Sequence, residues 1–465
     1  MHATLEEVAE MVGGQLVMGE GRQPIDAVTT DSRNVAPNSL FVPLLGPRFD
    51  GHQFAQQALL AGAVAVLWDR SLPLPFTPPA LIQVEDALAA LGRLAKAWLA
   101  RVGATVVGIT GSNGKTTTKE LAAAALSTRY RVARTQGNYN NVIGLPLTVL
   151  QMEPGTQIAV LEMGMNHAGE IRALTAIAAP HVAVITLIGE AHIENLGSRE
   201  AIAAAKAEIL ERMGSADIAL LNGDEPLLLP YAKRFPGTVR TFGKGETCDY
   251  RLVRLLTGDW ERTYFLGWSR TSGEHAFELA FGGRHNAINA LAAWGVAESF
   301  GIDAREVAEA FAQVRLPDGR LQRRVLADGS TLIDDTYNAS PTSTLAALEM
   351  VADTTSSQHK GLLLGEMREL GQQASLYHRQ VAQRAAQVAD RIVFVGPLFE
   401  EAWQDCQRHG PSSVRFCWYL DIAAALDDHV ERWFSDCSLI LAKGSHAVGL
   451  SAAVKAIIGA RGGLR

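Results

Sequence analysis

The central part of the chain alternates short apolar runs with segments of helical periodicity. From Thr105 onward the runs are TVVGIT, IAVLEMG, HVAVITLIG and DIALLNGDEP, and each is separated from the next by a helical pattern. Buried parallel strands have such nearly continuous apolar runs because helices cover both faces of their sheet. The pattern therefore predicts an α/β fold with a doubly wound parallel sheet in the middle of the chain.

Two further patterns flank this sheet. Before it, runs such as LFVPLL and AVAVLW alternate with polar loops, which predicts a small mixed α/β module. We expect that module to end near residues 71–79, SLPLPFTPP, because prolines interrupt helices and central strands. An amphipathic helix from Val84 to Arg101 is expected to follow it.

The last third repeats the central pattern. The runs GSTLIDD, GLLLGEM, RIVFVG and SLILAKG alternate with Ala-rich helices, which predicts a second, Rossmann-like α/β domain. Between it and the central strands, a polar alternating stretch from Cys248 to Gly282 predicts a small antiparallel meander, followed by a helix from about His285. The resulting division is residues 1–83, 84–316 and 317–465.

The composition of the chain mainly argues against certain classes of protein. A net charge of -7 over 465 residues disfavours a nucleic-acid surface, which needs clustered Lys and Arg. The acidic amino terminus MHATLEEVAEMVGG does not resemble a signal peptide, and no apolar run reaches the length of a membrane span. Four widely spaced cysteines without a C-x-x-C pair indicate neither zinc nor disulfides. We therefore expect a reduced, cytoplasmic protein, with no nucleic-acid partner, and a monomer.

The strongest chemical signal is TVVGITGSNGKTTTKELAAAAL, where an apolar strand turns through glycines into an Ala-rich helix. Such a loop binds phosphate, because its N–H groups and the helix N-terminus converge on the phosphate oxygens. Lys115 is expected to reach the β- and γ-phosphates and Thr116 a bound Mg²⁺. The spacing departs from the strict P-loop pattern at Ile109, so an ordinary glycine-rich turn is the alternative. The predicted ATP-binding loop consists of Gly111, Ser112, Asn113, Gly114, Lys115, Thr116 and Thr117.

Two further residues are candidate metal ligands. Glu162 ends the run IAVLE, and His192 follows the next apolar run, so both should reach the edge where the phosphate loop lies. A lone histidine is more often a hydrogen-bonded loop residue, but beside a phosphate loop a ligand role is favoured. With Thr116, they form the predicted metal site.

These motifs resemble those of the Mur ligases, the ATP-dependent amide-forming enzymes that assemble the peptidoglycan stem peptide. The similarity covers essentially the whole chain and includes T-G-x-N-G-K-T at 110–116, the two metal ligands, Lys206, G-R-H-N at 283–286 and Gly319-Arg320. It implies three domains and acyl-phosphate chemistry with ATP and two Mg²⁺ ions. It also implies that Lys206 is carbamylated by CO2 and acts with Lys115 and His192 in catalysis.

Four blocks narrow the resemblance within that family: QGNYNNVIGLP, LEMGMNHAGEI, DDTYNASPTS and GEMRELG. They fit the member whose partners are UDP-N-acetylmuramoyl-tripeptide and D-alanyl-D-alanine. The resemblance implies a nucleotide site at Asn286, Arg320, Asp335 and Tyr337, from two domains that close over ATP. It implies substrate contacts at Ser32, Arg33, Arg48, Asn138, Asn141, Asn338, Ser340 and Lys443. Ser340 and His446 depart from the usual Y-N-A-N-P and K-G-S-R patterns.

The predicted reaction follows from carboxylate chemistry. A carboxylate is a poor acyl donor, so transfer of the ATP γ-phosphoryl group creates an acyl phosphate that an amine can attack. An amide ligase of the same fold with another acceptor, such as a folylpolyglutamate synthase, is one alternative. A non-catalytic nucleotide-sugar-binding protein is the other, although it would be expected to have lost Lys115, Thr116 or Glu162. Whether the tripeptide ends in diaminopimelate or lysine stays open.

Overall fold

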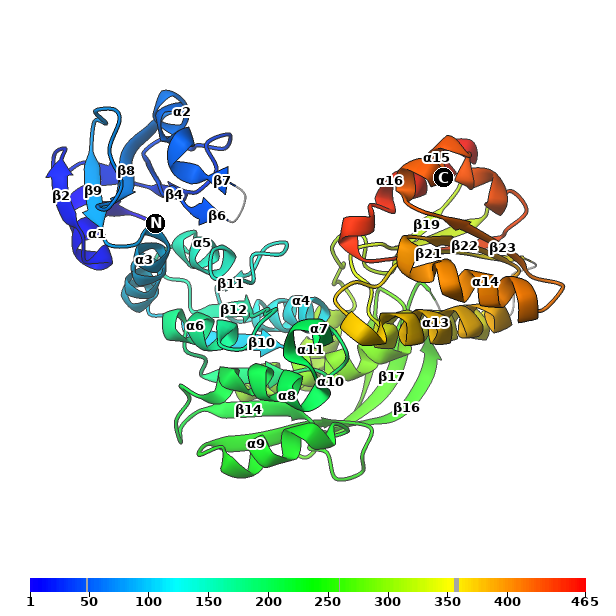
Figure 1. The fold of residues 1–465 in the computed structure, drawn as a ribbon. Coiled ribbons are helices and arrows are strands. Elements are labelled where there is room, and N and C mark those ends of the chain that lie inside the picture. The colour runs from blue at the N-terminus through cyan, green and yellow to red at the C-terminus, as the bar shows by residue number, and fades with distance from the viewer. Residues whose placement is uncertain (47–48, 259, 355–358) are drawn as a thin grey trace.

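The computed structural model describes residues 1–46, 49–258, 260–354 and 359–465, and within them it forms three large sheets. Figure 1 shows the N-terminal sheet, in blue, and the C-terminal sheet, in yellow to red, on opposite sides above the central sheet. This arrangement confirms the predicted α/β class. In the described part of the chain, no helix combines the length and the apolar character needed to cross a bilayer.

The N-terminal sheet has five strands in the order β2-β9-β8-β5-β4. Its strands are β2 (Gln15–Met18), β9 (Leu81–Val84), β8 (Ala63–Asp69), β5 (Ser39–Phe41) and β4 (Ala27–Thr29). Helices α1 (Leu5–Val12) and α2 (Ala55–Leu60) accompany it, with the strand pairs β1 (Ala3–Thr4) and β3 (Pro24–Ile25), and β6 (Leu45–Gly46) and β7 (Phe49–Asp50).

The proline-rich stretch 71–79 does not end this module, so that expectation was wrong. It is a loop between β8 and β9, and β9 returns to pair with β8 in the same sheet. The prolines prevent helix and strand only within residues 71–79, and the apolar run LIQV that follows them is buried in the same sheet as β8. The helix α3 (Ala87–Val102) starts later than predicted, because Asp86 accepts the hydrogen bond of the Ala89 N–H and caps it.

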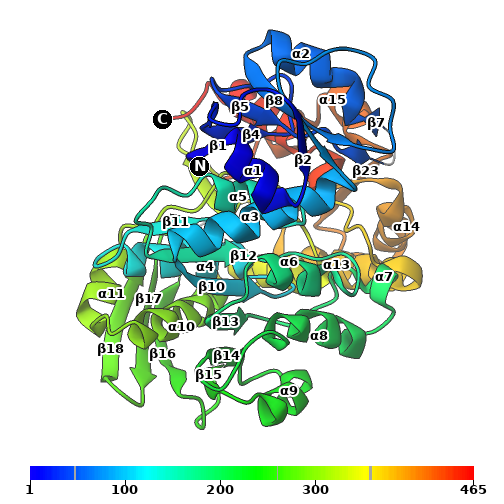
Figure 2. The ribbon, with the colours of Figure 1, turned by 90° about the vertical axis from the view of Figure 1, so that its left-hand side faces the viewer.

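Helix α3 joins the N-terminal module to the central one. It contacts α1 on one side and α5 and α6 of the central part on the other, and Figure 2 shows it between the two. The side chain of Trp98 on α3 is buried and donates a hydrogen bond to the Met152 carbonyl at 3.1 Å. The helix is therefore part of both cores.

The central sheet has nine strands in the order β11-β12-β10-β13-β14-β15-β16-β17-β18, of which the pairs from β11 to β16 are parallel and the last two are antiparallel. The antiparallel meander is thus an extension of this sheet. The strands are β11 (Val132–Arg134), β12 (Ile158–Glu162), β10 (Thr105–Thr110), β13 (Val182–Ile185), β14 (Ile218–Asn222), β15 (Thr238–Gly243), β16 (Tyr250–Gly258), β17 (Thr263–Ser269) and β18 (Gly273–Leu279).

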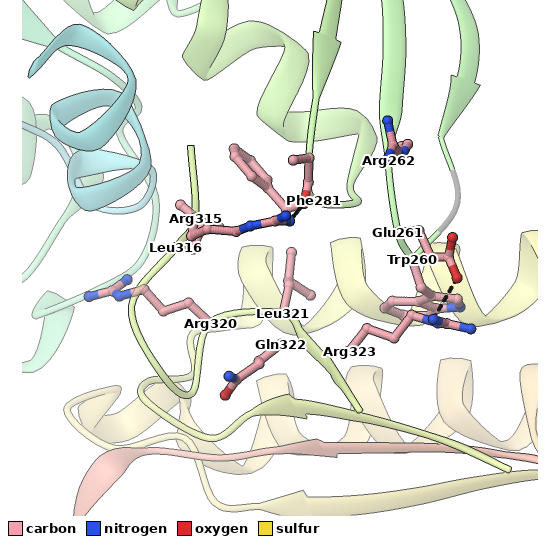
Figure 3. A pocket seen from close by; sticks show the side chains of 11 residues that line it. Trp260, Glu261, Arg262, Phe281, Arg315, Leu316, Arg320, Leu321, Gln322 and Arg323 are labelled. Atoms are coloured by element: carbon pink, nitrogen blue, oxygen red, sulfur yellow. Dashed lines mark hydrogen bonds and ion pairs between the residues drawn. The ribbon is translucent and has the colours of Figure 1, made fainter. Parts of the chain in front are cut away.

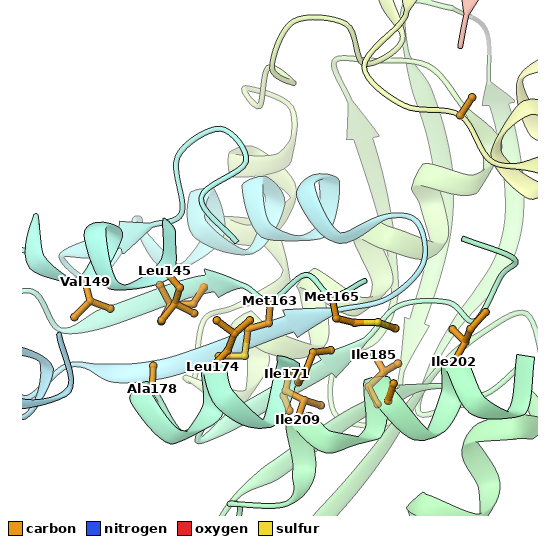
Figure 4. Packing of buried hydrophobic residues seen from close by; sticks show 14 of the residues in the cluster. Leu145, Val149, Met163, Met165, Ile171, Leu174, Ala178, Ile185, Ile202 and Ile209 are labelled. Atoms are coloured by element: carbon orange, nitrogen blue, oxygen red, sulfur yellow. The ribbon is translucent and has the colours of Figure 1, made fainter. Parts of the chain in front are cut away.

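Helices cover both faces of the central sheet, as a doubly wound fold requires. They are α4 (Lys115–Leu126), α5 (Gly144–Leu150), α6 (Glu170–Ile177), α7 (Ile193–Leu196), α8 (Arg199–Ala207), α9 (Leu229–Arg234), α10 (Arg284–Ser299) and α11 (Ala304–Phe311). Side chains of α4 and α10 form one core with alternate residues of β10. On the other face, Leu145, Leu174, Ile185 and Ile202 pack together, as Figure 4 shows.

The C-terminal sheet has six strands in the order β19-β20-β24-β21-β22-β23, and all pairs except β19–β20 are parallel. The strands are β19 (Gln322–Val325), β20 (Thr331–Asp335), β24 (Leu439–Lys443), β21 (Lys360–Gly365), β22 (Arg391–Val395) and β23 (Arg415–Tyr419). The helices are α12 (Pro341–Asp353), α13 (Ala374–Val388), α14 (Glu400–His409), α15 (Ile422–Asp427) and α16 (Ser451–Ala460). The four predicted strands are present; the polar edge strand β19 and the short β23 were missed.

Candidate active site

The phosphate loop leaves β10 and enters α4 through two glycines with positive φ. Gly111 has φ 148° and Gly114 has φ 84°. A Cβ atom on Gly114 would lie 2.3 Å from the Asn289 side-chain oxygen on α10, and one on Gly111 would lie 1.8 Å from the Thr186 hydroxyl oxygen. Both the backbone conformation and the close approach therefore require glycine at these positions.

The loop is held from the segment that follows β13. The Thr186 hydroxyl donates to the Asn113 carbonyl at 2.6 Å, and the Ser112 N–H donates to the Leu187 carbonyl at 2.8 Å. Helix α4 has Gly114 as its N-cap, and no side chain of the described residues caps it. Its first N–H groups are thus available to an anion, and the helix dipole favours a negative charge there.

Lys115 lies folded over this loop. Its ammonium donates to the Gly111 carbonyl at 2.8 Å and to the Ser112 carbonyl at 3.5 Å. Burial lowers the pKa of Lys115, while the charge of Glu162 opposes this shift. Its only acceptors among the described residues are backbone carbonyls of the loop itself, so a phosphate oxygen would give the cation a stronger partner.

Thr116 and Glu162 come together at the end of β10 and β12. The Thr116 hydroxyl donates to one carboxylate oxygen of Glu162 at 2.8 Å, and Asn140 donates to the other at 2.8 Å. Glu162 is 2% exposed. A hydroxyl and a carboxylate are oxygen ligands of the kind that Mg²⁺ prefers, so this pair fits a hard divalent cation. Among the described residues no group of three or more His, Cys, Asp or Glu side chains is arranged so that it could hold a metal ion by itself.

Asn140 was missed by sequence reasoning. Its signal was the run NYNN, from which the neighbours Asn138 and Asn141 were selected. Asn138 is exposed, and Asn141 accepts the N–H groups of Ile143 and Gly144 at 3.1 and 2.8 Å, where it holds the start of α5. Three asparagines in one loop cannot be ranked by composition, because only the fold decides which one faces Glu162.

His192 lies just before α7 with φ 67°, and among the described residues its ring is hydrogen-bonded to neither Thr116 nor Glu162. Its Nδ1 shares a short hydrogen bond with the carboxylate of Glu369 from the C-terminal part of the chain. This bond lowers the pKa of Glu369. Glu369 was not singled out from the sequence, although it belongs to the block GEMRELG.

Lys206 is buried on α8, with 1% of its surface exposed. Within the described residues its ammonium has no carboxylate or hydrogen-bond partner. Burial lowers its pKa well below the usual value, and the charge of Lys115 lowers it further. Lys206 is therefore not a solvated lysine on the surface of α8.

The C-terminal candidates meet at the ends of β20 and β24. Asp335 and Lys443 are register partners, and their side chains form an ion pair of 2.6 Å. The Lys443 ammonium also donates to the Asn338 carbonyl at 2.9 Å. The guanidinium of Arg320 lies 4.0 Å from the ring centre of Tyr337, a cation–π geometry.

The two departures from the family pattern have identifiable contacts. Ser340 caps α12, and its hydroxyl accepts a hydrogen bond of 3.1 Å from the Asn113 amide of the phosphate loop. It thereby links the loop to the C-terminal part of the chain. The ring of His446 meets that of Tyr337 edge-on, with centres 5.8 Å apart.

Asn286 lies in the first turn of α10 and is buried. Its amide donates to the Gly282 carbonyl at 2.7 Å, and its oxygen accepts from Asn289 at 3.0 Å. The side chain therefore holds the start of α10 beside Gly114, which Asn289 also contacts. It belongs to the wall behind the phosphate loop.

The N-terminal module, which carries Ser32 and Arg33, lies away from the start of α4, where the phosphate loop ends (Figure 1). The Ser32 hydroxyl donates to Gln57 at 3.2 Å. Arg33, whose side chain is 82% exposed, pairs with Asp31 at 2.8 Å and lowers the pKa of that carboxyl to about 2. Arg48 lies outside the described residues. The structure does not bring Ser32 or Arg33 together with the phosphate loop.

A cleft of about 560 Å³ opens beside Arg320 (Figure 3). Arg315 and Leu316 reach it from the segment that connects the central and C-terminal parts, and Arg323 forms an ion pair of 2.5 Å with Glu261 there. The cleft was not predicted, because its walls come from segments that are distant in sequence. It extends the site around Arg320 with a strongly basic lining.

Comparison with known proteins agrees with this geometry. Three family models match: "Mur ligase family, catalytic domain" over residues 24–99, "Mur ligase middle domain" over 109–297 and "Mur ligase, glutamate ligase domain" over 319–446. The UDP-N-acetylmuramoyl-tripeptide–D-alanyl-D-alanine ligase of Bacillus subtilis is 40% identical over 460 residues, which cover 98% of each chain.

Solved structures show the same similarity. A crystal structure of MurF from Acinetobacter baumannii has a TM-score of 0.88 at 28% identity and covers 99% of both chains. MurF from Thermotoga maritima, solved in complex with ADP, has a TM-score of 0.80 at 29% identity and covers 93% of this chain and 97% of that one.

Proposed function

The chain belongs to the Mur ligase family, and from this premise we propose that it is the ATP-dependent ligase that joins D-alanyl-D-alanine to UDP-N-acetylmuramoyl-tripeptide. The observation that carries the proposal is the phosphate loop with Thr116 and Glu162 in contact at 2.8 Å, in a chain that matches such ligases from end to end. The ADP complex of the Thermotoga maritima relative supports the use of ATP.

The chain's own residues account for the first step. The terminal carboxylate of the tripeptide attacks the γ-phosphorus of ATP, the bond to the β-phosphate oxygen breaks, and ADP leaves. The N–H groups at the start of α4 and the Lys115 ammonium face the charge that spreads over the transferring group. The neutral dipeptide amine then attacks the acyl carbon, the bond from that carbon to the phosphate oxygen breaks, and inorganic phosphate leaves with the proton that the amine loses.

Thr116 and Glu162 would hold one Mg²⁺, and His192 would contribute to a second. When bound, the ions offset the negative charge of the phosphates and of the attacking carboxylate. The direct hydrogen bond between Thr116 and Glu162 shows that the two oxygen donors share one location, which supports this assignment.

Lys206 is proposed to be carbamylated. A neutral amine adds to CO2, forming an N–C bond and releasing one proton, which turns the side chain into an anion. The buried position of Lys206 and its lowered pKa favour the neutral amine that this addition needs. An anion there would also be attracted by the charge of Lys115, which acts on Lys206.

The remaining assignments concern ligand binding. We assign the nucleotide to the loop together with Asn286, Arg320, Asp335 and Tyr337, and the acceptor side to Asn138, Asn141, Asn338, Ser340 and Lys443. Ser32, Arg33 and Arg48 are assigned to the UDP-sugar. The three-domain division, the cytoplasmic location and the monomeric state also stay predictions.

The test is phosphate release with ATP, Mg²⁺, UDP-N-acetylmuramoyl-tripeptide and D-alanyl-D-alanine, each omitted in turn, with mass spectrometry of the product. We expect release that needs every component and a pentapeptide product. Release that is indifferent to the dipeptide would instead indicate a ligase for another amine. Absence of release under all combinations would favour a nucleotide-sugar-binding protein.

A further inference from the structure

Two residues from different parts of the chain, His192 and Glu369, are hydrogen-bonded to each other, and the first is the proposed ligand of a second metal ion. Besides the side-chain bond between His192 Nδ1 and the Glu369 carboxylate, the Glu194 N–H donates to the Glu369 carbonyl at 3.1 Å. His192 has φ 67° and Glu369 has φ 64°, although neither is glycine. Residues held in this sparsely populated region cost energy and persist where the surroundings fix them.

The segment that carries His192, residues 186–192, is hydrogen-bonded both to the phosphate loop and to α12 of the C-terminal part. At one end, Thr186 and Leu187 hold the phosphate loop. Further along, Glu190 accepts a hydrogen bond of 2.5 Å from Thr342 on α12. The segment therefore lies between the phosphate loop and the C-terminal part of the chain. Within that C-terminal part, Glu369 is the residue that is hydrogen-bonded to the imidazole of His192.

We propose that Glu369 is a positioning residue for His192: its carboxylate accepts the Nδ1 proton, which leaves the lone pair of Nε2 free for a metal ion. The inference rests on the proposed role of His192 as a metal ligand. A carboxylate on the second nitrogen of a ligating histidine fixes both the tautomer and the direction of the ring. Here the carboxylate comes from another part of the chain, so the ligand is completed only when that part is docked.

A simple tether between the two parts would make a different prediction. In that interpretation the contact of Glu369 with His192 only holds the central and C-terminal parts together, as the contact of Thr342 with Glu190 does. The tautomer of His192 would then not depend on Glu369. The two interpretations therefore differ in the state of the imidazole in protein without metal. That state can be measured without reference to activity.

The experiment is ¹⁵N NMR of the histidine rings in metal-free protein at a pH where imidazole is neutral. The His192 signal is assigned by its loss in His192→Gln, since the chain has 12 histidines. In the wild type we expect the proton on Nδ1. In Glu369→Gly, which suits the left-handed backbone, we expect the proton to move mainly to Nε2. Glu369→Asn, which also tolerates positive φ but falls one carbon short, is the second truncation if the glycine variant is unstable.

Two further variants complete the design. Glu369→Gln can still accept the Nδ1 proton and should keep the wild-type tautomer, whereas Thr342→Val breaks the neighbouring contact and should leave His192 unchanged. An unchanged tautomer in a folded truncation variant would overturn the proposal. A change in Thr342→Val equal to that in the truncation would overturn it as well, in favour of a tether.

Titration with Mg²⁺ separates this inference from the proposed function. We expect Mg²⁺ to shift the His192 Nε2 signal in the wild type, and the midpoint to rise about 10-fold or more in the truncation. No shift in the wild type would refute the metal role of His192. A normal shift in the wild type with an equal midpoint in the truncation would refute only the role of Glu369.

Discussion

Two regions carry residues that were selected from the sequence: the phosphate-loop junction, where residues 111–117 meet Glu162 and the C-terminal part of the chain, and the N-terminal surface around Ser32 and Arg33. They differ in how their side chains are fixed. At the junction, Thr116, Glu162 and Asn140 are joined by hydrogen bonds inside the structure. On the N-terminal surface, Arg33 is largely exposed, and its partner among the described residues is Asp31, two residues away. The first region is preorganised for its chemistry, whereas the described candidates of the second, Ser32 and Arg33, make separate local contacts.

The difference follows from what each ligand demands. Phosphoryl transfer requires several groups at defined distances, so the loop is built into the core with glycines that no other residue can replace. Recognition of a remote part of the substrate contributes binding energy and tolerates looser geometry. We therefore expect variants at the junction to change the chemical step and variants on the N-terminal surface to change mainly KM.

The largest effect is expected for Lys115→Ala. Removing the cation that faces the transferring phosphoryl group should lower the rate of phosphate release about 100-fold to 1000-fold. The melting temperature should change little, because the acceptors of the Lys115 ammonium among the described residues are carbonyls of the loop itself. Activity close to that of the wild type would contradict its assignment.

Lys119, four residues along α4, is the matched control. It is buried, and its ammonium donates to the Thr135 carbonyl at 2.7 Å. Lys119→Met leaves that buried carbonyl unpaired and should reduce the free energy of unfolding by about 1–3 kcal/mol. One lysine of this helix should thus affect rate and the other stability.

Lys206→Met is expected to raise the stability of the protein and to abolish its activity. In protein depleted of CO2, the buried Lys206 amine has a lowered pKa, to which the charge of Lys115 contributes, so its replacement by a nonpolar chain should raise the free energy of unfolding near pH 7 by about 1–3 kcal/mol. The gain should shrink as the pH rises toward the ordinary pKa of lysine, because the unfolded state then no longer binds the extra proton. Activity should be lost at every pH.

The carbamate itself is tested on the wild type. Protein depleted of CO2 should lose activity and regain it with bicarbonate, and ¹³C-bicarbonate should give a carbamate signal that is missing in Lys206→Met. Full activity after depletion, with no such signal, would exclude the modification.

Ser340→Ala should have an intermediate effect that is confined to the junction. Loss of the α12 cap should cost about 1 kcal/mol of stability, and loss of the bond to Asn113 should raise the KM for ATP. Ser198→Ala removes the cap of α8, which has no such bond across the junction, and should match only the loss of stability. Equal KM values in the two variants would show that the bond to Asn113 has no role in nucleotide binding.

The same contrast explains what the sequence could predict. The loop from Gly111 to Thr117 was identified because its motif is local: strand, glycines, lysine and helix follow one another in the chain. Asn140, Glu369 and the cleft beside Arg320 were missed because distant segments create them. The prolines of 71–79 were misread as a boundary, since local composition does not reveal that β9 pairs with β8.

The smallest effect is expected for Arg33→Ala on the N-terminal surface. Its KM for the UDP-sugar should rise by less than about 10-fold, with the maximal rate unchanged, because an exposed charge contributes little binding energy.

The pKa of Asp31, held at about 2 mainly by its hydrogen bond to Arg33, should return toward 3.8 in the same variant. A lowered pKa stabilises the folded state above the ordinary pKa, and this contribution disappears as the pH falls from about 4 to 2. The stability difference between wild type and variant should therefore be small at pH 7 and vanish near pH 2. A loss of maximal rate in Arg33→Ala would instead place this surface within the chemical step and remove the contrast between the two regions.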